Sequence, residues 1–124
     1  MARLTFQDYS SLVGQAYNRY NCWALVIEFY RLHGIVLDEY HDRDSTVPPK
    51  EEINSLIRAN IKNFEKVTNP EYGDILLFRI EGIESHIGVY VGDGRFLHSL
   101  EKQGSAIGRL SMWKSKLSTI CRCL

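Results

Sequence analysis

The 124-residue sequence predicts an α+β fold in which helices come first and an antiparallel sheet follows. Up to residue 64, apolar residues recur at the spacing of three and four that is typical of amphipathic helices. After Pro70 the pattern changes to short apolar runs between glycine-rich or polar turns, which is typical of strands. A chain of this length can bury a core of its own, so we expect residues 1–124 to form one domain.

A short helix is expected over residues 5–16, with Thr5 as its N-cap. Its apolar positions are Phe6, Tyr9, Leu12, Val13 and Ala16. A further helix is expected over residues 51–64, because one apolar stripe follows two glutamates that favour the positive helix end.

Between these two, the stretch NCWALVIEFYR predicts the helix that matters most for function. It should begin at Asn21 or Cys22, with Asn21 as N-cap, and run to about His33. Gly34 is well placed to end it. Cys22 therefore stands at a helix start, either as buried filler or as a thiol placed to react.

The second half predicts strands joined by turns, and a helical turn around Trp113 in SMWKSKL. The expected strands cover residues 75–79, 86–91, 96–99, 106–110 and 119–123.

The hairpin HIGVYVGDGRFLHS carries the strongest geometric prediction. If Gly92–Gly94 forms a three-residue loop, Val91 faces Arg95 and Gly88 faces His98. Alternation then puts His86 and His98 on one face with Gly88, Tyr90 and Phe96, within reach of each other. Ile87, Val89, Val91 and Leu97 take the other face. A two-residue loop would separate the histidines.

These residues together suit nucleophilic catalysis. Gly88 has no side chain, so the helix headed by Cys22 could approach the sheet there, and the helix start and an imidazole would both lower the thiol pKa. Cys22, His86 and His98 then fit nucleophile, base and orienting residue. Taken singly, each also has a plain structural explanation, as a core thiol or a histidine bonded to backbone.

Other polar residues are weaker candidates. Tyr17 is either core filler or a hydroxyl at the site. Asp74 suits a turn or strand start better than a catalytic acid, and His33 and His41 are interpreted as solvated.

Composition excludes several classes of protein. Fifteen basic residues balance fifteen acidic ones, so no net field attracts nucleic acid, and the longest apolar run is too short to insert in a membrane. The odd number of cysteines argues against a disulfide framework, and no second cysteine pair supports a metal site on Cys121 and Cys123. We expect no metal and no cofactor. The N-terminus lacks a signal-peptide pattern, so synthesis and retention in the cytoplasm are expected.

The order of YNRYNCWALV, PEYGDILLF and SHIGVYVGDGRFLHS resembles the NlpC-type cell-wall cysteine peptidases, a papain-like superfamily. The likeness runs from about Gly14 to Trp113. It implies a nucleophile-bearing helix packed on an antiparallel sheet, with Cys22 as nucleophile, His86 as base and His98 as third polar residue. Tyr17 matches a family tyrosine near the thiol, whereas Asn21 stands where most relatives have aspartate.

The resemblance also implies a substrate: the stem peptide of peptidoglycan, often cut between D-glutamate and diaminopimelate. The small size, the lack of a signal-peptide pattern and the Cys-Trp pair look most like the members encoded with phage tails or gene transfer particles. That implies tail-tip proteins as partners, a place on a virion tail, and action in the periplasm or cell wall. Two alternatives stay open: a catalytically inactive tail or wall-binding module, and a thiol amidase or acyltransferase.

Overall fold

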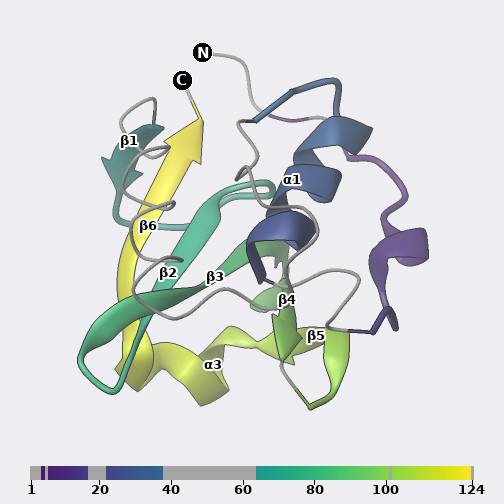
Figure 1. Ribbon diagram of the computed structural model, residues 1–124. Coiled ribbons are helices and arrows are strands. Elements are labelled where there is room, and N and C mark those ends of the chain that lie inside the picture. The colour runs from purple at the N-terminus through teal and green to yellow at the C-terminus, as the bar shows by residue number, and fades with distance from the viewer. Residues whose placement is uncertain (1–3, 5, 17–21, 38–63, 101, 124) are drawn as a thin grey trace.

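The computed structural model describes residues 4, 6–16, 22–37, 64–100 and 102–123. Their centre is an antiparallel sheet of six strands in the order β1-β6-β2-β3-β4-β5. The sheet is strongly curled, and α1 lies against it (Figure 1). This confirms the α+β prediction. The strands are β1 (Phe64–Val67), β2 (Ile75–Ile80), β3 (Ile83–Gly92), β4 (Arg95–Leu100), β5 (Gly104–Arg109) and β6 (Leu117–Cys123).

Helix α1 (Cys22–Leu32) begins at the predicted cysteine and packs mainly against β3 and β4. Gly34 adopts a φ of +78°, a left-handed conformation that glycine takes without strain, and its N–H donates to the carbonyl of Arg31. The helix end is therefore set by local sequence, as predicted. In the described part of the chain, no helix is long and apolar enough to cross a bilayer.

The sheet buries side chains on both faces. On one face, α1 covers a core that includes Ile87, Val89 and Leu97. On the other, α3 (Leu110–Trp113) and the 3₁₀ turn η2 (Lys114–Lys116) cover a smaller cluster. That second cluster consists of Leu76, Phe78, Phe96 and Ile120, with Trp113 among the half-buried residues around it. Alternation along the strands thus separates two apolar layers.

The β3–β4 hairpin has the predicted facing pair but a different turn. Gly88 is opposite His98, as expected, whereas Gly92 and not Val91 is opposite Arg95. The turn is formed by Asp93 and Gly94, both with positive φ, as a type I′ turn requires. A bulge between Tyr90 and Gly92 adds the residue that the shorter loop lacks. It restores the alternation, so the histidines share a face despite the two-residue turn.

The helix predicted over residues 5–16 is wrong for the described residues. Its only helical part is a 3₁₀ turn, η1 (Ser10–Leu12), and Gly14 has a φ of +83°. Its C-terminal part, from Leu12 to Gln15, bonds instead to Ser105 of β5, because tertiary hydrogen bonds outweigh a weak helical pattern. Ser105 Oγ donates to the carbonyl of Leu12 at 2.6 Å and accepts from the N–H of Gln15 at 2.8 Å.

The helix predicted over residues 51–64 falls outside the described residues except for its last position. Phe64 opens β1, which pairs with β6, so the C-terminal boundary of that prediction is wrong. The pattern missed this strand because four residues, FEKV, are too few to show a period. The other strands and the helical turn around Trp113 are confirmed, with ends that differ by a few residues.

Gly104 gives a stability prediction. Its φ is +77°, and a Cβ there would lie 2.2 Å from the carbonyl oxygen of Gln15. We expect Gly104→Ala to lower the free energy of unfolding by about 2–4 kcal/mol, from the backbone conformation and the overlap together. Gly94→Ala is the matched control, because Gly94 has a similar φ of +74° but open space around it. Urea unfolding of both variants measures the difference, and equal losses would contradict the steric part.

Candidate active site

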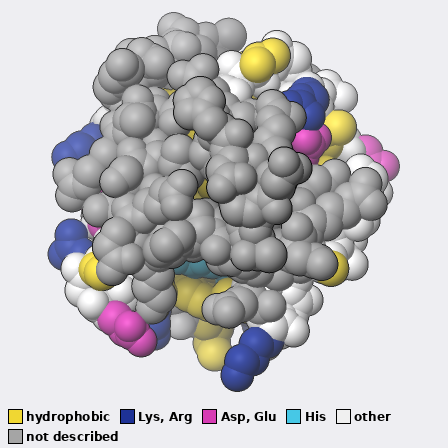
Figure 2. Space-filling model, in the orientation of Figure 1, with side chains coloured by type: hydrophobic (Ala, Val, Ile, Leu, Met, Phe, Trp, Pro, Cys, Tyr) yellow, Lys and Arg dark blue, Asp and Glu magenta, His cyan; other side chains and the backbone are white. Residues whose placement is uncertain are grey.

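The two hairpin histidines are bonded to each other. His86 from β3 and His98 from β4 lie on one face of the sheet, with His86 Nε2 and His98 Nδ1 3.0 Å apart. Both are buried, at 9% and 2% exposure. The prediction that these two imidazoles meet is therefore confirmed. Histidine atoms reach the face shown in Figure 2 beside hydrophobic side chains.

Three aromatic side chains, Phe78, Phe96 and Trp113, surround the histidine pair, and we call them the aromatic box. Phe78 lies opposite His86 in the β2–β3 register, with ring centroids 5.7 Å apart. Phe96 contacts His98 at 4.4 Å. Trp113 contacts both imidazoles, at 5.4 Å for His86 and 5.1 Å for His98. Sequence reasoning placed Phe96 on this face but missed the other two, although Phe78 could have been found from strand pairing.

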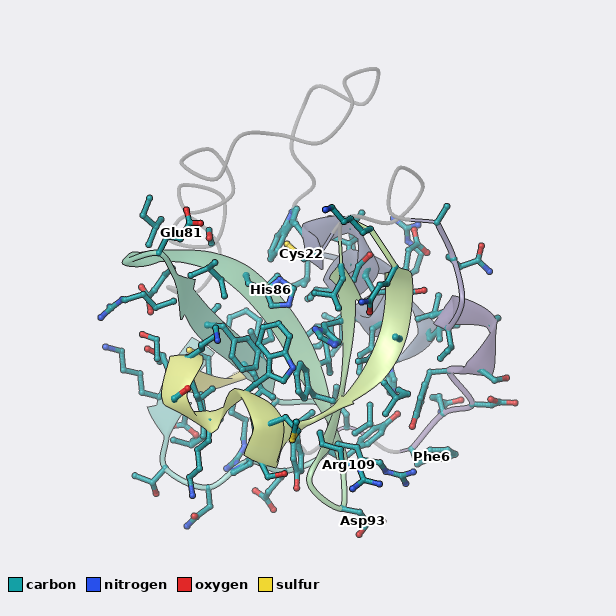
Figure 3. The ribbon with its side chains drawn as sticks, turned by 90° about the horizontal axis from the view of Figure 1, so that it is seen from below. Phe6, Cys22, Glu81, His86, Asp93 and Arg109 are labelled. Carbon is teal, nitrogen blue, oxygen red and sulfur yellow. The ribbon has the colours of Figure 1, made fainter. Side chains whose placement is uncertain are left out.

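Cys22 is the first residue of α1 and lies beside the β3 segment that carries His86. Its Sγ–H donates to the carbonyl of Ser85, with a sulfur–oxygen distance of 4.0 Å. Figure 3 shows the Cys22 side chain next to the His86 ring. On β3, the pairing with β4 covers only Gly88 to Gly92. The start of α1 contacts β3 at Ser85, which comes before this paired stretch. The structure thus places the predicted thiol beside His86, through the strand segment that carries this residue.

Gly88 was expected to let the helix headed by Cys22 approach the sheet, and this prediction is wrong. A Cβ there would lie 2.9 Å from both the carbonyl oxygen of Leu97 and Cδ2 of Phe96, and 3.4 Å from Cβ of His98. The missing side chain makes room for β4 residues on the histidine face, whereas α1 packs on the opposite face. Gly108 acts in the same way from β5, since its Cβ would lie 2.8 Å from His98 Nε2.

Burial controls the charges at the site. It raises the pKa of the Cys22 thiol to about 11, and backbone N–H groups, first that of Ile87, oppose this rise without cancelling it. Burial also lowers the pKa of His86 to about 3, helped by the neighbouring His98, and lowers the pKa of His98 to about 4. The sequence led us to expect a lowered pKa for Cys22, whereas the structure raises it. A thiol with 2% exposure loses the hydration that its charged form needs. All three groups are neutral at pH 7 in this structure.

The remaining sequence candidates separate clearly. Tyr17 and Asn21 lie outside the described residues, as does His41. The interpretation of His33 as solvated is wrong: it is half-buried, bonded through Nδ1 to the carbonyl of Phe29 and through Nε2 to the hydroxyl of Tyr72, both at 2.8 Å.

Asp74 precedes β2, as the sequence indicated. It is buried, and its carboxylate accepts two hydrogen bonds from Arg122 of β6, at 3.0 and 2.8 Å. It also accepts the backbone N–H of Glu71 at 2.8 Å. These contacts lock a turn to the sheet and make Asp74 a structural residue.

Cys121 is a free, buried thiol of the α1-side core, and the side chain of Cys123 is not described. Within the described ranges, no three or more histidine, cysteine or acidic side chains are grouped to bind a metal ion.

The hydrogen bond between the imidazoles decides which nitrogen can act on the thiol. His86 Nε2 is engaged with His98, so Nδ1 is the nitrogen left for proton transfer. A base needs a free lone pair there, which requires the tautomer in which His86 Nε2–H donates to His98 Nδ1. In that state His98 orients His86 and can stabilise the imidazolium that forms.

Comparisons with known proteins identify a family and a fold for this chain. The NlpC/P60 family model matches residues 8–122. Over 82 residues the chain is 28% identical to the murein DD-endopeptidase MepS/murein LD-carboxypeptidase of Escherichia coli K12, which is 64% of this chain and 39% of that protein. The chain thus spans about two fifths of the length of that curated relative.

Solved structures show the same fold. An NlpC/P60 family protein from Bacillus cereus ATCC 10987 superposes with a TM-score of 0.67 at 18% identity, covering 93% of this chain and 37% of the other. A lipoprotein-like NLP/P60 family protein from Staphylococcus aureus Mu50 gives 0.58 at 18% identity, covering 90% and 34%. With nearly its whole length matched by the family model, the chain belongs to the NlpC/P60 family.

Proposed function

We propose that this chain is a cysteine peptidase that hydrolyses amide bonds in the stem peptides of peptidoglycan. The observation that carries the proposal is the bonded histidine pair, 3.0 Å between His86 Nε2 and His98 Nδ1, beside a thiol at a helix start. The murein peptidase named among the similar proteins supports the substrate class.

The reaction would proceed in two halves. His86 takes the thiol proton as Cys22 Sγ attacks the amide carbonyl carbon, forming a carbon–sulfur bond. The carbon–nitrogen bond then breaks, and His86 passes the proton to the leaving amine. Water, deprotonated by His86, attacks the thioester, releases the carboxylate and returns the proton to the thiol. The oxyanion would be met by the backbone N–H of Cys22, with Tyr17 and Asn21 as further candidates.

Within this proposal we favour the bond between D-glutamate and diaminopimelate as the one cut. We also propose a place on a phage tail, with tail-tip proteins as partners and action in the periplasm or cell wall after synthesis in the cytoplasm. The relative from Escherichia coli is named as a DD-endopeptidase and LD-carboxypeptidase, so the test must separate these bond types.

The test is a digest of purified murein analysed by mass spectrometry. The favoured bond predicts fragments that end in D-glutamate together with peptides that begin with diaminopimelate. Fragments from a DD- or LD-type cut would show that another peptide bond is the one cleaved, and the assignment as a peptidase would stand. Release of the whole stem peptide from the sugar would indicate an amidase. An acyltransferase would join an added amine to the product. A digest without new termini would refute the peptidase.

A second candidate is a catalytically inactive wall-binding module. The observation that favours it is the buried Cys22 thiol, whose pKa is raised to about 11 while the partner histidine is neutral. In such a site the thiolate is scarce at neutral pH.

Thiol labelling separates the two candidates. In the free chain we expect Cys22 to react slowly at pH 7, with a rate that rises steeply above pH 9, because alkylation needs the thiolate. If murein fragments accelerate labelling at pH 7, substrate activates the thiol and the peptidase is supported. Binding without acceleration supports the inactive module. The labelling is carried out in Cys121→Ala protein, so that the other described buried thiol does not add to the signal from Cys22.

A further inference from the structure

Trp113 touches both imidazoles from an element far from them in sequence. Its ring stacks on His86 with an interplanar angle of 22° and meets His98 edge-on at 87°. It also packs edge-on against Phe78 at 5.5 Å and Phe96 at 6.1 Å. Among the described residues, Trp113 is therefore the ring that contacts both histidines and both other members of the aromatic box.

We propose that Trp113 is a positioning residue, which fixes the plane of His86 and keeps water from the histidine pair. The effect of Trp113 on the geometry of the histidine pair does not depend on which bond the chain cuts. Only its expected effect on turnover rests on the proposed function.

Few contacts are able to hold the plane of an imidazole ring. Rotation about the Cβ–Cγ bond of histidine is soft, so the ring needs a neighbour on its face. A stacked indole gives that neighbour, and the edge-on contact with His98 fixes the second ring at the same time. His86 Nδ1 can serve the thiol only while His86 Nε2 points at His98 Nδ1. A rotated His86 ring would therefore lose both its hydrogen bond to His98 and its position as a base.

Burial gives independent support. It is the largest cause of the low pKa of both histidines, and Trp113 is one of the side chains that exclude water from them. Among the residues that the structure describes, the charged and titratable groups nearby are the two imidazoles, the Cys22 thiol on the α1 side and Lys116 of η2, whose ammonium lies 5.9 Å from the Trp113 ring centre. Removing the indole would also remove a π face that favours imidazolium, but the gain in hydration is the larger effect.

The first measurement is histidine NMR on the whole chain, between pH 8 and 4.5. In the wild type we expect His86 to stay neutral throughout and His98 to begin to titrate only at the acid end. In Trp113→Ala the pKa values of both imidazoles should rise toward the ordinary value of about 6.5, so that both groups titrate within the range. Trp113→Phe keeps a stacking ring and should stay close to the wild type. Leu117→Ala is the matched control, because Leu117 packs on the same cluster as Trp113 without an aromatic ring.

The second measurement is turnover of murein peptides. Trp113→Ala should lower kcat by about 10- to 100-fold with little change in KM, since a displaced base is costly. The acid limb of its kcat/KM profile should move to higher pH, and Trp113→Phe should restore most of kcat. A merely structural role would lower stability without moving the pH profile.

The outcomes are distinct. Unchanged imidazole titration in a folded Trp113→Ala chain overturns the proposal; if that variant does not fold, Trp113→Leu replaces it, and unchanged titration there does the same. Altered titration in a chain whose wild type cuts nothing supports the positioning role and refutes the peptidase.

Discussion

Cys22→Ala is expected to abolish murein hydrolysis, with a loss of at least about 10³-fold, while the fold is kept. The sulfur is the atom that attacks the carbonyl, and no other group in the proposed mechanism can replace it. Mass spectrometry of the digest measures the loss, and circular dichroism with urea unfolding checks the fold.

Cys121→Ala is the matched control for this result. Cys121 is also a free thiol, has 1% exposure against 2% for Cys22, and belongs to the same core cluster. Both variants therefore remove a buried sulfur from the same layer, and their costs in stability should be similar. Full activity in Cys22→Ala, or equal loss in both variants, would contradict the assignment of Cys22 as nucleophile.

Acid is expected to unfold this chain through the histidine pair. The folded-state pKa values of His86 and His98, about 3 and about 4, lie below the unfolded value of about 6.5, so the unfolded chain binds more protons between these limits. Stability is full above pH 6.5 and falls as pH drops toward 3. The loss between pH 7 and 4 should be about 3–6 kcal/mol, measured by urea unfolding at each pH.

His98→Asn tests the source of this slope. Asparagine can still accept a hydrogen bond from His86 Nε2 but does not titrate in this range. Its pH dependence should be flatter by roughly half, because one of the two buried imidazoles is gone. A slope equal to that of the wild type would assign the acid sensitivity to other groups.

The opposed directions of the two kinds of pKa shift have one cause. Burial disfavours whichever form is charged, so it raises the pKa of the Cys22 thiol and lowers the pKa of both histidines. Proton transfer from thiol to imidazole is therefore unfavourable in the free site. If the peptidase is active, substrate must supply contacts that stabilise the separated charges, which is why labelling with and without murein fragments is informative.

The hairpin shows how a correct geometric prediction can rest on a wrong detail. The three-residue loop was inferred from Gly92–Gly94, whereas the structure combines a two-residue turn with a bulge. Both arrangements leave Gly88 opposite His98, because the bulge offsets the one-residue change in register that the shorter turn alone would cause. The shared face of the histidines depends on this register.

Sequence by itself determined the features that depend on local order: the start of α1 at Cys22, its end at Gly34, and the facing of Gly88 and His98. Periodicity and turn chemistry act over a few residues, so they can be read along the chain. Only the tertiary structure decided that the stretch from Leu12 to Gln15 bonds to Ser105 of β5, that Trp113 meets the imidazoles, and that the thiol is buried and neutral. These depend on contacts between segments up to 93 residues apart and on the water that such contacts exclude, neither of which leaves a local pattern.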